Sequence, residues 1–179
     1  MGVFAGEFYS ESLRMTTQLK VIFPDRSNDV TPVILGEPSV LYLLHGLAGN
    51  AAEWPRFSKI EYYAKKYNLI VVMPEVQRSF YMDTAYGPKY FTYVSGELPD
   101  ICNAWFKLPK EREKTFVAGE SMGGMEHLNV LCVAPNGSAQ LRRCQVCLTL
   151  HTRHVISFRK TGLMWNLARC EPYWGKKAL

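Results

Sequence analysis

The sequence has no apolar run long enough to cross a membrane, and its last third has almost no acidic residues. A bilayer-spanning helix needs about 20 consecutive apolar residues, and no such run occurs in the 179 residues. Residues 1–7 contain no basic segment followed by an apolar one, so a secretory signal peptide is not expected. We therefore predict a cytoplasmic protein without a membrane partner.

Acidic residues are scarce in one part of the chain only. Residues 1–124 hold 13 Lys and Arg against 14 Asp and Glu, whereas residues 125–179 hold 8 against 2, with no aspartate. The same tail holds four of the five cysteines. We therefore divide the chain into one globular part, residues 1–124, and a basic, cysteine-rich tail, residues 125–179.

Strand and helix patterns alternate along the globular part. Two alternating segments, 4–9 and 16–23, predict an antiparallel edge hairpin. The later elements are a buried strand at 40–44, an amphipathic helix at 60–67, a buried strand at 69–73, a helix over 91–105 that Pro99 kinks or divides, and a strand at 115–118. This order predicts an α/β fold with a mostly parallel, doubly wound sheet.

A short motif follows the last of these strands. Gly119, Ser121 and Gly123 form the pattern G-x-S-x-G. In a nucleophile elbow, the serine occupies a sharp strand-to-helix turn with a strained backbone, and only small neighbours fit beside it. The pattern by itself also fits a glycine-rich turn, but the preceding strand favours the elbow.

Four segments of the globular part carry a family resemblance. They are VLYLLHGLAGNAAEW, LIVVMPEVQRSFYMDTAYG, KYFTYVSGELPDIC and TFVAGESMGG. They resemble the esterase D / S-formylglutathione hydrolase family, and within it the tributyrin-esterase-like branch. The resemblance implies an α/β-hydrolase fold, short-chain acyl ester substrates and no cofactor. It also implies that Ser121 is the nucleophile and that the backbone amides of Leu47 and Met122 form the oxyanion hole. Glu120 departs from the residues more usual in the family at that position.

The general base and its orienting acid are not evident. In this fold the chain order is serine, then acid, then histidine. The residues after Ser121 that could fill these roles are Glu126, Glu171, His127, His151 and His154. Glu171 has no histidine after it, and Glu126 is within about a turn and a half of the nucleophile on the same helix. We therefore predict a serine carboxylesterase that is inactive or nearly so, or alternatively a non-catalytic remnant that binds esters.

The tail does not resemble the family. When residues 125–150 are back-translated and read one base earlier, a family-like continuation emerges, so we hypothesise a single-base deletion near codon 125. The C-terminal part of the hydrolase fold would then be missing. The strand at 115–118 would become an exposed edge that promotes self-association or aggregation.

The tail also contains a Cys/His group and scattered basic residues. The group is Cys144, Cys147, His151 and His154. Its two pairs are closer together than those of a zinc finger, so we predict chance spacing rather than a metal site. No nucleic-acid-binding fold accompanies the basic residues, so no nucleic-acid partner is expected.

Other candidates in residues 1–124 stay open or are assigned structural roles. His45 precedes the nucleophile, which favours a hydrogen-bonded structural residue over a base. Asp83 and a group of aromatic residues have two possible roles: they line an acyl pocket, or they pack under a long loop. The aromatic residues are Phe80, Tyr81, Tyr86, Tyr90 and Tyr93.

Overall fold

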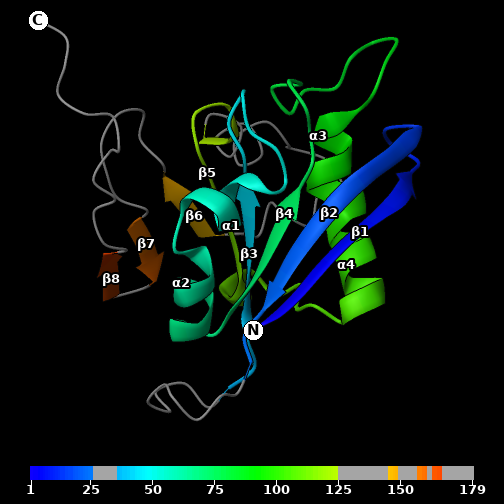
Figure 1. Ribbon diagram of the computed structural model, residues 1–179. Helices are drawn as coiled ribbons and strands as arrows, with labels where there is room; N and C mark the ends of the chain where they lie inside the picture. The colour runs from blue at the N-terminus through cyan, green and yellow to red at the C-terminus, as the bar shows by residue number, and fades with distance from the viewer. Residues whose placement is uncertain (26–35, 125–144, 149–156, 161–162, 167–179) are drawn as a thin grey trace, which may run out of the picture.

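The computed structural model describes residues 1–25, 36–124, 145–148, 157–160 and 163–166. The strands are β1 (Gly2–Ser10), β2 (Met15–Phe23), β3 (Ser39–Leu44), β4 (Leu69–Pro74), β5 (Thr115–Gly119), β6 (Gln145–Leu148), β7 (Ser157–Lys160) and β8 (Leu163–Asn166). The helical segments are α1 (Glu53–Phe57), α2 (Ile60–Lys66), α3 (Tyr90–Thr92), η1 (Tyr93–Glu97), α4 (Leu98–Phe106) and η2 (Arg112–Lys114). One sheet contains all the described strands, in the order β1-β2-β4-β3-β5-β6-β7-β8 (Figure 1).

The sheet is parallel at its centre and antiparallel on both sides. β3 lies between β4 and β5 and runs parallel to both, and β5 and β6 are also parallel. The pairs β1–β2, β2–β4, β6–β7 and β7–β8 are antiparallel. The predicted edge hairpin is confirmed, but the described sheet is mixed rather than mostly parallel.

The strand that carries the G-x-S-x-G motif is not at an edge, so that prediction is wrong. β5 pairs with β3 on one side and with β6 on the other, where Phe116 is opposite Gln145 and Val117 is opposite Val146. Strand pairing uses backbone N–H and C=O groups, so a short β-prone segment such as Gln-Val-Cys-Leu can extend a sheet whatever its origin. The absence of a family resemblance in the tail therefore did not mean that β5 lacks a neighbouring strand on that side.

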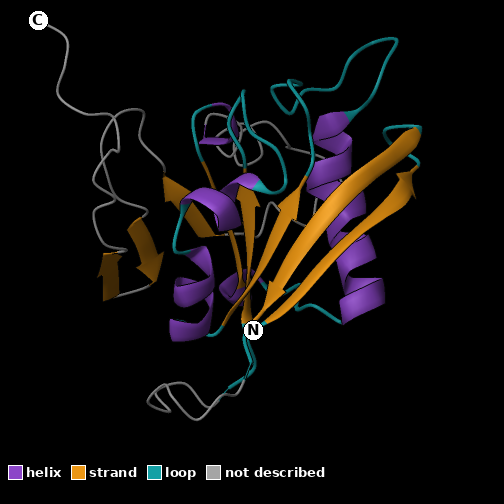
Figure 2. Cartoon of the chain, viewed as in Figure 1, coloured by secondary structure: helices purple, strands orange, loops and turns teal. Residues whose placement is uncertain are grey.

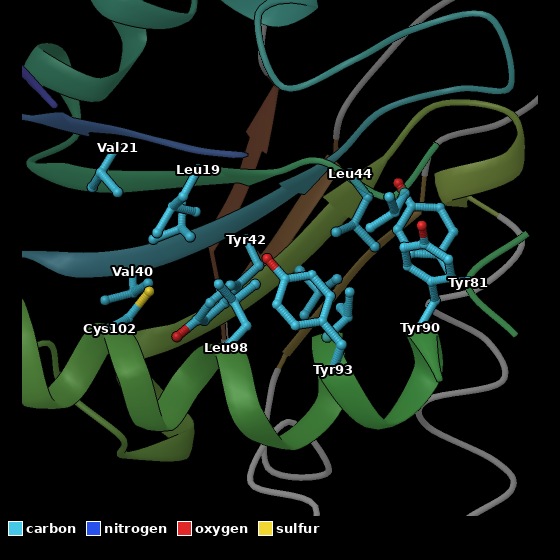
Figure 3. Close-up of a cluster of buried hydrophobic side chains, with 14 of the residues drawn as sticks. Leu19, Val21, Val40, Tyr42, Leu44, Tyr81, Tyr90, Tyr93, Leu98 and Cys102 are labelled. Carbon is cyan, nitrogen blue, oxygen red and sulfur yellow. The ribbon is translucent and has the colours of Figure 1, made fainter. Parts of the chain in front are cut away.

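Helices lie on opposite faces of the sheet, as Figure 2 shows. On one face, the side chains of α3, η1 and α4 pack against alternate residues of β2, β3 and β4. Figure 3 shows Tyr93, Leu98 and Cys102 on the helical segment, directed at the strands. On the other face, Ile60 and Ala64 of α2 pack with the intervening strand residues. Because successive side chains of a strand point to opposite faces of the sheet, each strand contributes residues to the cores on both faces.

The helical stretch from Tyr90 to Phe106 changes type immediately before Pro99. The N–H of Leu98 donates to the carbonyl of Tyr93, which is the wide spacing of a π-helix. Pro99 has no N–H to donate to the carbonyl four residues earlier, so it occupies the first turn of α4. The helical residues nevertheless run without a gap from Tyr90 to Phe106, so Pro99 does not divide the helix into two as predicted; it coincides with the change of helix type.

A carboxylate at the end of η1 anchors the β1–β2 turn. Glu97 Oε2 accepts hydrogen bonds from Ser10 Oγ at 2.8 Å and the Ser12 N–H at 3.0 Å, and Oε1 accepts one from the Glu11 N–H at 2.8 Å. Burial raises the pKa of Glu97, but the bonds to Ser12, Ser10 and Glu11 outweigh burial, so its pKa is lowered. The ionised carboxylate therefore stabilises the hairpin.

We expect Glu97→Gln to lower the free energy of unfolding by about 1 kcal/mol at neutral pH, because the amide is a weaker acceptor and the site is partly solvated. The lowered pKa means that the contribution is present above the ordinary value of 4.5 and is lost as the pH falls through the folded-state pKa. Urea unfolding at several pH values measures this. Glu11→Gln, in the same turn but with no bonded carboxylate, should have no effect, and equal effects from both variants would refute the anchor.

None of the helices in the described ranges has the length and apolar character needed to span a membrane.

Candidate functional site

The register of the central strands brings two loops together. Leu44 at the end of β3 is paired with Gly119 at the end of β5. The segments that begin at His45 and Glu120 therefore leave the sheet side by side, at the carboxyl ends of these two parallel strands. A Cβ placed on Gly46 would lie 3.7 Å from the Cβ of Ser121. The glycine-rich loop after β3 thus lies in contact with the turn that carries the serine.

Ser121 has an unusual backbone conformation. Its φ is 49°, in the left-handed region that non-glycine residues seldom adopt. Two backbone hydrogen bonds hold the turn: the Glu120 N–H donates to Leu44 O at 3.2 Å, and the Gly123 N–H donates to Glu120 O at 2.8 Å. Strain of this kind persists where the surroundings impose it, and it is frequent at active sites.

The two glycines of the motif make close backbone contacts. A Cβ on Gly119 would lie 2.5 Å from the carbonyl carbon of Gly123. A Cβ on Gly123 would lie 2.7 Å from Leu44 O and 2.9 Å from His45 O. Because the obstructing atoms belong to the backbone, they have little freedom to move aside. The turn therefore packs against the end of β3 with no room for a side chain at either position.

The two residues predicted to supply the oxyanion hole are on the adjoining loops. Leu47 is part of a tight turn in which the Gly49 N–H donates to Gly46 O at 3.1 Å, and its side chain packs against the core. Met122 follows Ser121 directly, and its side chain is buried in the same core cluster. Packing of both side chains against the core thus holds the two residues at the ends of β3 and β5.

His45 is a buried structural residue. Its Nδ1 donates to Gly46 O at 2.8 Å, and its Nε2 accepts from the Val76 N–H at 3.2 Å. Burial lowers the pKa of His45, but the Glu75 carboxylate and the Gly46 carbonyl outweigh burial, so the pKa is raised. Both ring nitrogens are engaged by the scaffold, which agrees with the structural role predicted for this histidine.

Glu75 joins the ends of β3 and β4. Its carboxylate accepts hydrogen bonds from the Ala51 N–H at 3.0 Å and the Gln77 N–H at 2.8 Å, and its Oε1 lies 3.5 Å from His45 Nε2. Burial raises the pKa of Glu75, but the bonds to His45, Ala51 and Gln77 outweigh it, and the pKa is lowered. Tyr81 also links its loop to the end of β3, because its hydroxyl donates a hydrogen bond to His45 O at 2.8 Å.

Two other carboxyl groups lie beside the glycine-rich loop. Burial raises the pKa of Glu53, and the negative charge of Glu120 raises it further. The Oε2 atom of Glu53 is buried and has no hydrogen-bond partner among the described residues, and its carboxylate leaves no room for a Cβ on Gly49. Sequence reasoning missed Glu53 and Glu75, since no local pattern distinguishes them from surface glutamates.

The aromatic residues in and after the long loop differ in burial. Tyr81, Tyr90 and Tyr93 are buried in the core (Figure 3), which is packing under the loop. Phe80 and Tyr86 are exposed. Asp83 accepts hydrogen bonds from the N–H and Oγ1 of Thr92 and therefore secures the start of the helical segment. Trp54, in α1 after the glycine-rich loop, donates from Nε1 to Leu44 O at 3.3 Å.

The predicted acid and base candidates all belong to the tail, residues 125–179. Glu126, His127, His151, His154 and Glu171 all lie outside the described residues. Of the Cys/His group, Cys147 is in β6, whereas Cys144, His151 and His154 are outside the described residues. In the part of the chain that is described, no cluster of His, Cys, Asp and Glu has the arrangement of a metal site.

Comparison with known proteins assigns the family. The model of the family described as "Putative esterase" matches residues 10–138, well over half of the chain. The chain belongs to this putative esterase family. An acetyl esterase from Caldicellulosiruptor saccharolyticus is 35% identical to it over 128 residues, which are 69% of this chain and 48% of the relative. The predicted resemblance to an esterase family is confirmed.

Solved structures agree with membership of the putative esterase family. The serine hydrolase FphF of Staphylococcus aureus is 34% identical, with a TM-score of 0.62 over 71% of this chain and 50% of that one. An S-formylglutathione hydrolase from Agrobacterium tumefaciens is 25% identical, with a TM-score of 0.60 over 75% of this chain and 53% of that one. The chain thus spans about half the length of these relatives, and its described sheet fits a hydrolase fold.

Proposed function

We propose that this chain carries the nucleophile and the oxyanion hole of a serine carboxylesterase that acts on short-chain acyl esters. The observation that carries the proposal is the left-handed backbone of Ser121, at a turn that packs against the glycine-rich loop. A backbone held in this way projects the serine hydroxyl from the end of the strand. The esterase and serine hydrolase relatives support the same reaction class.

In the proposed reaction, Ser121 Oγ bonds to the ester carbonyl carbon and the bond from that carbon to the alcohol oxygen breaks, which forms an acyl-enzyme. The proton lost by the Ser121 hydroxyl is balanced by the proton that the leaving alcohol gains, with water as the carrier. The negative charge on the carbonyl oxygen is stabilised by the N–H groups of Leu47 and Met122. Water then hydrolyses the acyl-serine and releases the acid. His45 does not serve as the base, because its ring nitrogens are bonded to Gly46 and Val76.

We further propose that turnover by this chain is very slow. A hydrolase triad needs an acid and a histidine after the serine, and the sequence offers no arrangement of residues after Ser121 that meets the need. Oxyanion stabilisation and binding alone supply only a small part of the usual acceleration. The doubly wound sheet, the division after residue 124, the cytoplasmic location and the absence of nucleic-acid and metal partners stay predictions from the sequence.

The test is acylation of the purified chain by p-nitrophenyl acetate. We expect the parent to acquire one acetyl group on Ser121, detected by intact mass and peptide mapping, with slow release afterwards. Ser121→Ala should acquire none at this position, because the attacking oxygen is absent. Ser39→Ala, which removes a hydroxyl at the end of β3 opposite to the motif, should react like the parent. Equal acetylation of the parent and Ser121→Ala would refute the proposed nucleophile and leave the non-catalytic alternative.

A further inference from the structure

The first strand forms one end of the described sheet. β1 pairs with β2 along all nine of its residues and has no neighbour on its other side among the described strands. Figure 1 shows β1 at the margin of the sheet. An edge strand of this length presents a row of backbone N–H and C=O groups that another strand can pair with.

This edge lacks the features that normally prevent strand pairing. Its sequence, GVFAGEFYS, contains no proline and no lysine, and Glu7 is its one charged residue. Two large apolar side chains are displayed on the solvent face, where Val3 is 56% exposed and Tyr9 is 57% exposed. The edge is therefore long, nearly uncharged and partly apolar.

The edge strand β1 is also held in place by packing against α4. The ring of Phe4 packs edge-on against Phe106 at 5.2 Å between centroids, and the ring of Phe8 packs against Trp105 at 5.5 Å. Trp105 is itself 50% exposed, so an apolar side chain also lies beside the strand on its α4 face, opposite to the face of Val3 and Tyr9. Glu97 fixes the far end of the hairpin. An edge that is ordered before binding loses little conformational entropy on pairing.

We propose that β1 is the dimer interface of this protein, where it pairs antiparallel with β1 of a second copy. The two-fold axis passes beside Gly6, which faces Gly6 of the second copy. This register is the one that pairs all nine residues of the strand. It places Val3 opposite Tyr9 of the second copy, and the same contact recurs on the other side of the axis.

The sequence of β1 suits its own copy better than an unrelated strand. About Gly6 the strand reads alike in both directions, with phenylalanine two residues away on each side and an exposed apolar side chain three residues away. The one charge, Glu7, is opposite Ala5 of the second copy, so no like charges meet. A self-complementary patch of this kind is what a two-fold interface requires.

Two double variants with the same positions changed test the register. Val3→Lys with Tyr9→Lys places lysine opposite lysine twice, whereas Val3→Lys with Tyr9→Glu places lysine opposite glutamate twice. Both remove the same two apolar side chains, and the β2 partners of these positions, Ile22 and Thr16, carry no charge. Sedimentation of the full chain over a wide range of concentrations gives the dissociation constant of each.

We expect the parent to be a dimer, the Lys/Lys variant to be a monomer, and the Lys/Glu variant to bind itself at least about tenfold more tightly than the Lys/Lys variant. Added salt should reduce this difference. A parent that is monomeric, or that forms larger species without a dimer, would overturn the proposal. Equal behaviour of the two variants, whether as monomers or as dimers, would overturn the register about Gly6.

Discussion

Replacement of Gly123 by alanine is expected to lower the free energy of unfolding by about 3 kcal/mol, because the new methyl group meets backbone atoms that have little freedom to move. The Cβ would lie 2.7 Å from Leu44 O and 2.9 Å from His45 O. Relief requires the turn to separate from the end of β3, which also moves Met122 away from the core. Urea unfolding at a fixed protein concentration measures the change.

Gly96→Ala is the matched control for Gly123→Ala. Gly96 lies in η1, and a Cβ there would meet nothing within 4 Å. Alanine should raise the free energy of unfolding by about 0.5 kcal/mol, because it restricts the unfolded chain and fits a helical backbone. A similar loss of stability in both variants would show that the Gly123 contact is not the cause.

Truncation of Glu75 should have the second-largest effect on stability. Glu75→Ala leaves the N–H groups of Ala51 and Gln77 without their acceptor, and we expect a loss of about 2 kcal/mol at neutral pH, since the site is half-buried and water reaches part of it. The variant should also loosen the glycine-rich loop. Glu61→Ala, on the exposed side of α2, is the control and should be nearly neutral.

The effect of Glu75 has a defined pH dependence. Because the folded-state pKa of Glu75 is lowered, its contribution is complete above the ordinary value of 4.5 and is lost as the pH falls through the folded value. For His45, whose pKa is raised, the contribution is complete below 6.5 and is lost as the pH rises through the folded value. The difference in the free energy of unfolding between the parent and Glu75→Ala should therefore be smaller at acid and at alkaline pH than in the range between them. A difference that is constant from acid to alkaline pH would contradict this pairing.

Local pattern was enough to predict the elements that surround the site. The apolar runs at 40–44 and 69–73 became β3 and β4, the stripe at 60–67 became α2, and the alternating segments at 4–9 and 16–23 became the edge hairpin. Each of these signals depends on neighbours within a few residues, where side-chain periodicity follows directly from backbone geometry. Pro99 was informative for the same reason, because its missing N–H acts on its own turn.

The unpredicted features depend on contacts between residues far apart in the sequence. Glu75 reaches Ala51, and Glu97 reaches Ser10 and Ser12, over distances along the chain that no spacing rule covers. The pairing of β5 with β6 was missed because composition was taken to exclude a strand. The position of Ser121 was predictable, but the left-handed value of its φ required the structure.

The position of β3 has a consequence for the order of events during synthesis. β3 pairs with β4, which follows it closely, and with β5, which begins about 70 residues later. At about 5–20 residues per second, a ribosome needs ~4–14 s to make that intervening stretch. Throughout this interval one side of a largely apolar strand has no β5 to pair with, so slower elongation lengthens its exposure and chaperones are needed to prevent premature contacts.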